Sequence, residues 1–298
     1  MPRFGPIDCV TIAAPDLAVA VDAYHRYLGY QVVARGTISA SLAESWARPA
    51  LLGRHYALML PQGNGQTYLR FVESKPAPRY IPFRHMGWNA AEFMVQDTDA
   101  IAAKLANSPF RIIGPPADLS FSDKIRAMQA IGPCNESIYL TSFKEKLAAF
   151  DTPDAKHFVD RVFIVICGGP SVAELNAFYA RHFGVAIAAV IPAIISVLSN
   201  AHGMASDSKH DLAAIALHGQ SYIEADSMPA GTLARDSIAG ELPPGIASVS
   251  FGIDSLQATT ARFLAPPRAL SEAPYRGRRA ATCVGAGGEL IELVEQSA

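Results

Sequence analysis

The chain repeats itself, and this internal repeat limits its possible folds more than any other feature of the sequence. The segment "PDLAVAVDAYHRYLG" (15–29) aligns without a gap with "PSVAELNAFYARHFG" (170–184). Each segment begins with a helix-capping residue, Asp16 or Ser171, and ends on a glycine. An oxygen at the cap satisfies a free amide of the first turn, and glycine readily takes the left-handed conformation that ends a helix. The sequence therefore predicts two equivalent amphipathic helices.

Other segments repeat at the same spacing. The segment "GQTYLRF" (65–71) matches "GQSYIEA" (219–225), and "IRAMQAIGPCNESIYL" (125–140) matches "RRAATCVGAGGELIEL" (278–293). Within each half, the order strand, helix and three strands recurs, and "DTDAI" (97–101) and "DSLQA" (254–258) are each expected to open a helix. The sequence thus predicts four βαβββ modules, at about 7–73, 88–142, 160–226 and 246–295. They form two domains, residues 1–145 and 155–298.

Composition excludes several classes of protein. Half of the 298 residues are hydrophobic and 17% are charged, which indicates a globular chain with a large core. The net charge of −2 gives no electrostatic reason to expect binding to nucleic acid or to an anionic membrane surface. The most apolar run, 185–198, is short and contains Pro192, so we expect a strand followed by a buried helix there.

The four cysteines are scattered and form no C-x-x-C pair. This pattern favours reduced thiols and a cytoplasmic protein over a disulfide framework or a zinc knuckle. The beginning of the sequence, "MPRFGPIDCV", lacks the basic and then apolar layout of a signal peptide.

The four-module plan, the "DCV" at a strand start, the short helix ending in "FY…FG" and the closing "GELIELVE" resemble the vicinal oxygen chelate superfamily. This superfamily includes glyoxalase I, bleomycin-resistance proteins and extradiol dioxygenases. The resemblance implies an α+β fold with two tandem half-barrel domains, each made of two paired modules whose sheets curl into a cup. It says little about the reaction, because one fold hosts many chemistries.

The resemblance also implies where metal ligands would lie, near the start of each module's first strand and in its last strand. Because a strand alternates faces, the cup-facing positions can be assigned by parity. In the first half these positions hold Cys9, Arg70, Ala90 and Tyr139, and in the second half Arg161, Glu224, Ser248 and Glu292. A guanidinium offers no lone pair, and none of these positions has histidine. We therefore predict no metal site and no cofactor, and we interpret Cys9 as a lost ligand.

The first cup is expected to contain one cation and one carboxylate among phenols and apolar walls. Its predicted members are Thr11, Tyr68, Arg70, Glu92, Met94, Tyr139 and Thr141. In the functional interpretation Arg70 grips a carboxylate or enolate oxygen, Glu92 moves a proton, and Tyr68 or Tyr139 donates to an oxyanion. In the alternative, Arg70 and Glu92 form a salt bridge that braces the cup.

The second cup is expected to contain a self-satisfied triad of Arg161 between two carboxylates. Its predicted members are Arg161, Phe163, Tyr222, Glu224, Ser248, Ser250, Thr282 and Glu292. Two nearby carboxylates also raise the pKa of one of them, which is one way to make a general acid or base. Insertions at 38–55 and 192–210 are interpreted as lids with Trp46 as an aromatic wall, or as short helices on the barrel rim.

Two functions follow from these features. The first is a metal-independent lyase, isomerase or epimerase for a small aromatic or carboxylated molecule, working as a monomer or homodimer. The second is a small-molecule binding protein of the bleomycin-resistance type, and a metal-dependent extradiol dioxygenase is disfavoured by the missing histidines. The expected catalytic residues are Arg70, Glu92 and Tyr139. The expected ligand-binding residues are Cys9, Thr11, Trp46, Tyr68, Met94, Arg161, Tyr222, Glu224, Ser248 and Glu292.

Overall fold

Four repeated modules are present in the computed structural model, which describes residues 3–148, 150–235 and 238–296, and the first three have the complete βαβββ order. The first module contains β1 (Phe4–Ala14), α1 (Leu17–Leu28), β2 (Tyr30–Thr37), β3 (His55–Pro61) and β4 (Tyr68–Glu73). The second contains β5 (Gly87–Val95), α3 (Thr98–Leu105), β6 (Arg111–Leu119), β7 (Ser122–Ile131) and β8 (Ser137–Phe143). The third contains β9 (Val159–Gly169), α4 (Val172–Phe183), β10 (Ile191–Ile194), β11 (Lys209–Leu217) and β12 (Ser221–Ser227). The fourth contains β13 (Ile246–Ile253), β14 (Arg268–Ala269), β15 (Arg279–Val284) and β16 (Leu290–Glu295).

The two insertions carry the remaining helices. The first holds α2 (Ala40–Ser45) and the 3-10 turn η1 (Pro49–Leu51), and the second holds α5 (Ser196–Ala201) directly after β10. The strand followed by a helix expected within 185–198 is therefore confirmed. None of the helices among the described residues is long and apolar enough to cross a membrane.

The two repeated helices begin and end as their sequences predict. The Asp16 carboxylate accepts a hydrogen bond from the Val19 amide at 2.9 Å, and the Ser171 hydroxyl accepts one from the Glu174 amide at 3.2 Å. Gly29 and Gly184 close the helices in the left-handed region, with φ of 76° and 72°. In a residue with a side chain that conformation is strained, so glycine fits the position.

The helix expected to begin at "DSLQA" in the fourth module is absent, and that prediction was wrong. The described residues between β13 and β14 contain a single turn, in which the Ala258 amide bonds to the Ser255 carbonyl. The Thr259 hydroxyl then donates to the His182 carbonyl and accepts from the Ala261 amide. A threonine side chain that bonds nearby backbone in this way competes with the helical ladder.

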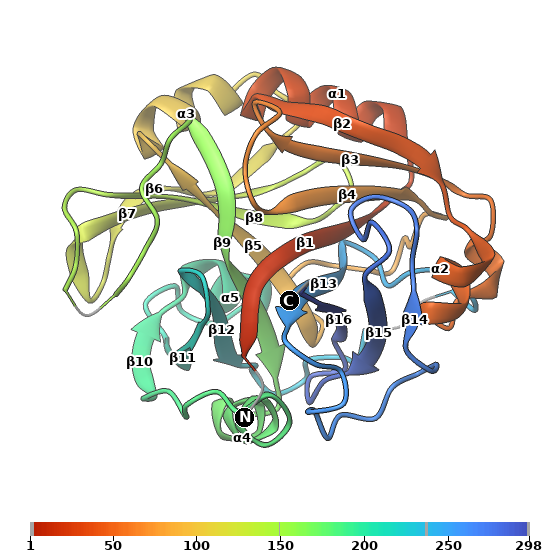
Figure 1. Ribbon diagram of the computed structural model, residues 1–298. Coiled ribbons are helices and arrows are strands. Elements are labelled where there is room, and N and C mark those ends of the chain that lie inside the picture. Colours follow the sequence, from red (N-terminus) through yellow and green to blue (C-terminus); the bar gives the residue numbers. More distant parts are fainter. Residues whose placement is uncertain (1–2, 149, 236–237, 297–298) are drawn as a thin grey trace.

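The sixteen strands of the described residues form two eight-stranded sheets (Figure 1). One sheet has the order β14-β15-β16-β13-β1-β4-β3-β2 and joins modules one and four. The other has the order β10-β11-β12-β9-β5-β8-β7-β6 and joins modules two and three. We refer to their concave faces as cup A and cup B, respectively. The half-barrel architecture is confirmed.

The pairing of modules differs from the expected one. Modules one and two were expected to share a cup within residues 1–145, and modules three and four within residues 155–298. Positions 1–2 and 297–298 of these ranges lie outside the described residues. Instead, β1 pairs antiparallel with β13 and β5 pairs antiparallel with β9, so each sheet takes one module from each half. The first strand of every module is apolar along most of its length, so hydrophobic pattern alone does not select its partner.

The two halves still keep one equivalent internal link. The Tyr24 hydroxyl on α1 donates to the buried Glu136 carboxylate at 2.8 Å, and the Tyr179 hydroxyl on α4 donates to the buried Glu289 carboxylate at 2.8 Å. Glu136 and Glu289 occupy matching places in the repeated segments 125–140 and 278–293. The gap-free repeat read from the sequence therefore corresponds to equivalent contacts.

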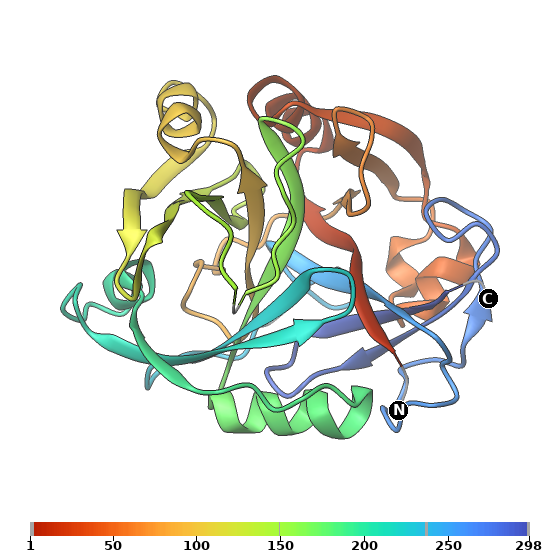
Figure 2. The ribbon, with the colours of Figure 1, turned by 60° about the vertical axis from the view of Figure 1, so that its left-hand side comes forward.

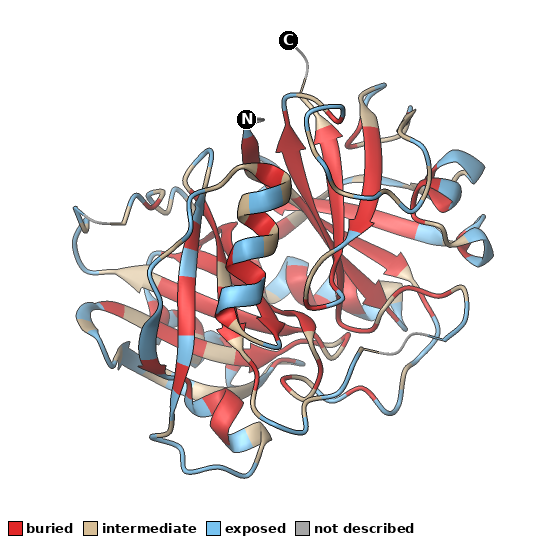
Figure 3. Cartoon of the chain, turned by 90° about the horizontal axis from the view of Figure 1, so that it is seen from below, coloured by how far each residue is buried: buried red, intermediate tan, exposed pale blue. Residues whose placement is uncertain are grey.

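The largest hydrophobic cluster lies between the convex faces of the two sheets and includes the inner faces of α1, α3 and α4. In Figures 1 and 2, α1 and α3 lie on one side of the molecule and α4 on the opposite side. The central strands are buried along most of their length, whereas the edge strands β2, β6 and β10 are largely intermediate or exposed and the helices alternate buried and exposed residues (Figure 3). Two smaller clusters lie on the concave faces, one in each cup.

Candidate functional site

Cup A contains a closed network of buried polar side chains. The Arg70 guanidinium lies 3.2 Å from the Glu292 carboxylate, and the two side chains are 1% and 0% exposed. Arg70 also donates to the Thr11 hydroxyl at 3.0 Å and to the Tyr275 hydroxyl at 2.6 Å. Its positive charge is thereby neutralised and hydrogen-bonded inside the protein, which is the condition for tolerating a buried charge.

Glu292 is equally well satisfied. Its carboxylate accepts hydrogen bonds from the Trp46 indole at 2.7 Å, from the Tyr275 hydroxyl at 2.7 Å and from the Ser250 hydroxyl. The Trp46 ring also lies 4.6 Å from the Arg70 guanidinium, in cation–π contact. Trp46 therefore fills cup A as part of its structure. It was expected to form an aromatic wall for a ligand, but its ring instead contacts Arg70 and its indole N–H bonds to Glu292.

The residues at the ligand positions of cup A do not fit a divalent metal ion. Strand pairing places Thr11 beside Arg70 and Ser250 beside Glu292, with Cys9 opposite Ser250. A cation fixed within this set repels a metal ion, and one carboxylate with hydroxyls does not supply the usual donor set. Burial raises the pKa of the Cys9 thiol to about 12, so this thiol is not a thiolate donor at neutral pH.

Cup B has the opposite character. Its polar side chains include Glu92 on β5, Tyr139 and Thr141 on β8, and Glu224 and Asp226 on β12. Glu92 lies beside Tyr139 in the sheet register, and Glu224 and Asp226 share one face because they are two positions apart along β12. Among the described residues, none of these five side chains forms a hydrogen bond or an ion pair of ordinary geometry.

Two of these groups are both buried and without a partner. The Asp226 Oδ1 atom and the Thr141 Oγ1 atom have no hydrogen-bond partner, although their residues are 3% and 0% exposed. Thr141 lies near the Glu92 carboxylate without a hydrogen bond of ordinary geometry. A buried polar group without a partner costs roughly 1–3 kcal/mol, so such groups need an explanation.

Burial shifts the acid–base behaviour of cup B. Burial raises the pKa of Glu92 and of Asp226 to about 7. Repulsion by the Glu92 charge also raises the pKa of Asp226. Burial, followed by the charges of Asp226 and Glu92, raises the pKa of Glu224 well above its usual range. Burial and the neighbouring carboxylates likewise raise the pKa of the Tyr139 phenol, which stays protonated at neutral pH. Cup B therefore holds carboxyl groups that can exchange protons near neutrality.

The walls of cup B are apolar and aromatic. They include Phe83, Met94, Ile164, Ile166, Tyr222 and Met228. Many of these residues keep slight exposure, with Met228 9% and Tyr139 8% exposed, whereas Arg70 and Glu292 in cup A are at 0%. Solvent therefore reaches the side chains of cup B but not the centre of cup A.

Each insertion packs against the cup of its own module. Helix α2 contacts β15 in cup A, where its Glu44 pairs with Arg268 and the preceding Ser39 hydroxyl donates to Glu272 at 2.5 Å. Helix α5 contacts β6 across cup B, and the Ser199 hydroxyl on it lies 2.8 Å from the His210 ring. Both insertions thus bring the two edges of a sheet together, as short helices that close the half-barrels.

Two predicted groupings of site residues were wrong because of the module pairing. Arg70 lies in cup A and Glu92 in cup B, so they form neither a catalytic pair nor a brace. Glu292 and Glu224 also lie in different cups, so Arg161 cannot sit between them. The other predicted residues divide between the cups. Cys9, Thr11, Trp46 and Ser248, with the half-buried Tyr68, belong to cup A, and Met94, Tyr139 and Tyr222 belong to cup B.

Arg161 has a different role from the predicted one. Its guanidinium donates to the Gln66 side chain at 2.9 Å and to the carbonyls of Gly219 and Gln220 at 3.0 and 3.1 Å. A β-bulge in the pairing of β9 with β5 reverses the alternation, so that Phe163 and Ile164 both contact the cup B cluster. The alternation rule, applied across this bulge, predicted Arg161 at the ligand position of β9. In the structure Ile164 and Ile166 face cup B instead.

Sequence reasoning missed Asp226 and Tyr275. Asp226 follows Glu224 by two residues on β12, so the parity rule applied one step further would have found it. Tyr275 lies in an irregular segment between β14 and β15, and no periodic pattern in the sequence marks its side chain as a partner of Arg70.

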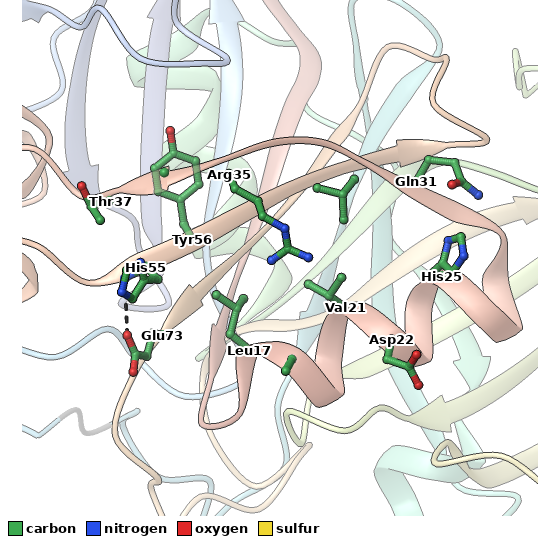
Figure 4. Close-up of a pocket in the computed structure, with 13 residues that line it drawn as sticks. Leu17, Val21, Asp22, His25, Gln31, Arg35, Thr37, His55, Tyr56 and Glu73 are labelled. Atoms are coloured by element: carbon green, nitrogen blue, oxygen red, sulfur yellow. Dashed lines mark hydrogen bonds between the residues drawn. The ribbon is translucent and has the colours of Figure 1, made fainter.

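A separate groove of about 940 Å³ lies between α1 and strands β2 and β3, outside both cups (Figure 4). Leu17 and Val21 line its helix side, Arg35 extends into it, and the His55 amide donates to Glu73 at 3.4 Å. Its charged groups are exposed and of both signs, so they do not define a ligand. We assign this groove no function.

No protein-family model and no curated protein matches the sequence. Among solved structures, glyoxalase I from Zea mays aligns with 99% of this chain and 92% of its own, with a TM-score of 0.65 and 14% identity. A protein assigned as a dioxygenase from Bacillus subtilis aligns with 100% of this chain and 87% of its own, with a TM-score of 0.61 and 12% identity. At these identities the likeness shows the fold alone, and the fold expected from the resemblance is confirmed.

Proposed function

Starting from a fold shared with glyoxalase I, we propose that cup B is the site of a metal-independent lyase, isomerase or epimerase that moves a proton on a small molecule. One observation carries this proposal. The Asp226 Oδ1 and Thr141 Oγ1 atoms of cup B are buried and lack hydrogen-bond partners among the described residues, whereas Arg70 and Glu292 of cup A are bonded to one another and to their neighbours. A ligand in cup B would supply the missing partners.

Glu92 is the proposed general acid or base. Its carboxyl faces cup B beside Tyr139, and burial raises its pKa to about 7, close to the pH at which proton transfer is most efficient. Tyr139 is the proposed hydrogen-bond donor to an oxygen that gains negative charge, because its phenol stays protonated. Arg70 and Cys9 take no part, since cup A is closed.

The ligand is proposed to have an aromatic or otherwise apolar body. Phe83, Met94, Tyr222 and the isoleucines of β9 form the walls against which such a body would pack. The expectation of a carboxylated ligand rested on Arg70, which lies in the other cup. We therefore do not retain it.

The proposal is tested by hydrogen–deuterium exchange at the carbon next to a carbonyl. Acetophenone, phenylacetone and 2-aminoacetophenone in deuterium oxide serve as probes, with exchange followed by proton NMR. We expect the protein to accelerate exchange of at least one probe, and Glu92→Gln to slow it about 100-fold or more without loss of binding. Asp123→Asn, which changes an exposed carboxylate outside the cup, is the matched control.

A second candidate is a binding protein, and one observation favours it. Among the described residues, cup B has no cationic side chain that could stabilise an enolate, so Tyr139 would act alone. Probes that bind in cup B without any accelerated exchange would support this candidate. Exchange that continues unchanged in Glu92→Gln would remove Glu92 from the mechanism.

The cysteines bear on the cellular setting. The four cysteines are free and buried, which supports a cytoplasmic protein. We propose that it acts on small molecules as a monomer or homodimer, without nucleic acid or membrane as a partner.

A further inference from the structure

The carboxyl groups of cup B have no basic partner. Glu92, Glu224 and Asp226 face the cup, and none of them forms an ion pair within the described part of the chain. Burial and the neighbouring carboxylates shift the pKa values of these groups, and the Thr141 hydroxyl also affects the pKa of Glu92. No lysine, arginine or histidine contributes to these shifts. Elsewhere in the protein, buried carboxylates such as Glu241 and Glu292 do have arginine partners.

We infer that the ligand of cup B is a small organic cation, a protonated amine carried on an apolar or aromatic body. This inference rests on the proposed function, because it takes cup B as the site. A positive group with several N–H donors would neutralise the carboxylates. It would also donate hydrogen bonds to the unpartnered Asp226 Oδ1 and Thr141 Oγ1 atoms. An anionic ligand would instead meet like charge in a buried setting.

The arrangement of the carboxyl groups favours an organic cation over a metal ion. Glu92 lies on β5 and Glu224 on β12, with β9 between them, so their strands are roughly 10 Å apart. Within residues 3–148, 150–235 and 238–296, no three histidine, cysteine or acidic side chains converge as a metal ion requires. An ammonium group carries N–H donors that point in different directions, so it can bond to carboxylates that extend toward it from separate strands.

The walls suit the remainder of such a ligand. Phe83, Tyr139 and Tyr222 offer aromatic faces, which attract cations when water is excluded. Met94 and Met228 are flexible and polarizable, so they can adapt to an apolar body of irregular shape.

Three probes of equal shape and different charge test the inference: benzylamine, benzyl alcohol and benzoate. Binding is followed at pH 8 by NMR of carbon-13-labelled methionine methyl groups. Met94 and Met228 report on cup B, and the buried Met59, which belongs to the central core, is the internal control. We expect benzylamine to shift Met94 and Met228 but not Met59, with a Kd at least 10-fold below that of benzyl alcohol, and benzoate to leave all three unchanged.

Two near-isosteric variants identify the carboxylates. Glu224→Gln and Asp226→Asn should each weaken benzylamine binding about 10-fold and leave benzyl alcohol binding unchanged, and Asp123→Asn should affect neither. An unaltered Met59 signal shows that each variant is folded. If benzyl alcohol or benzoate binds in cup B as tightly as benzylamine, the cationic class is wrong while the site stands. If no probe shifts Met94 or Met228, both the inference and the proposed site fail.

Discussion

The Arg70 guanidinium and the Glu292 carboxylate lie 3.2 Å apart although 222 residues separate them in the chain. They sit at the centre of cup A, on β4 of the first module and β16 of the fourth, and both are inaccessible to solvent. Strand pairing brings this ion pair together with Thr11 on β1 and Ser250 on β13. The pair accounts for the closed state of cup A.

Removing one partner of this ion pair should lower the unfolding free energy more than replacing both partners with apolar residues. Arg70→Met alone leaves the Glu292 charge buried without its cation, and Glu292→Leu alone leaves the Arg70 charge buried, so each should lose about 3–5 kcal/mol of unfolding free energy. The double variant should lose much less than the sum. Denaturant unfolding of all four proteins provides the coupling energy. Additive losses would show that the two charges do not interact.

A metal ion should not bind in cup A. Protein incubated with zinc, nickel, manganese or ferrous salts and then desalted should retain well under one equivalent, because the Arg70 charge occupies the ligand set. Elemental analysis measures the content, and melting temperature with and without chelator is the second readout. Near-stoichiometric metal that disappears in Glu292→Gln would contradict this account of the cup.

The two tyrosine–glutamate contacts should contribute equally in the two halves. Tyr24→Phe removes one of the donors to the buried Glu136, and Tyr179→Phe removes the equivalent donor to Glu289. Each variant should lower the unfolding free energy by about 1–3 kcal/mol, the usual effect of leaving a buried acceptor short of a partner. Tyr27→Phe on the outer part of α1 is the control. A loss in one half only would argue against an equivalent role.

The stability of the protein should fall as the pH rises from about 5 to 8. Burial raises the folded-state pKa of Glu92 from its ordinary value of 4.5 to about 7, so the folded state binds more protons than the unfolded state in this window. The contribution is complete below pH 4.5 and is lost as the pH passes through 7. Glu92→Gln should reduce the difference in unfolding free energy between pH 5 and pH 8 by on the order of 2 kcal/mol. Asp123→Asn should leave the difference unchanged, and a Glu92→Gln protein with the wild-type pH profile would refute the assigned shift.

Local signals predicted much of this fold, and the reasons are specific. Asp16, Ser171, Gly29 and Gly184 set the ends of two helices by contacts with neighbouring residues, so their effect can be read within a short window. Strand alternation placed Glu92, Tyr139, Glu224 and Glu292 on concave faces for the same reason.

Module pairing could not be derived in this way. The apolar edges of β1, β5, β9 and β13 are chemically alike, and the choice among them depends on how the whole chain closes. The bulge in β9 is likewise a tertiary feature, and it moved one residue out of the predicted alternation. Tyr275 reaches Arg70 from an irregular segment, which no periodicity marks.

The seam between β1 and β13 has a consequence for synthesis on the ribosome. The pairing of β5 with β9 can form once residue 169 has emerged, and the whole sheet of cup B once residue 227 has emerged, but β1 must wait for a partner more than 230 positions further along the chain. Until then its apolar edge is open, and long-range strand pairing of this kind is slow and exposes a nascent chain to aggregation. The sheet of cup A is therefore completed last, although it contains β1, the first strand to be synthesised.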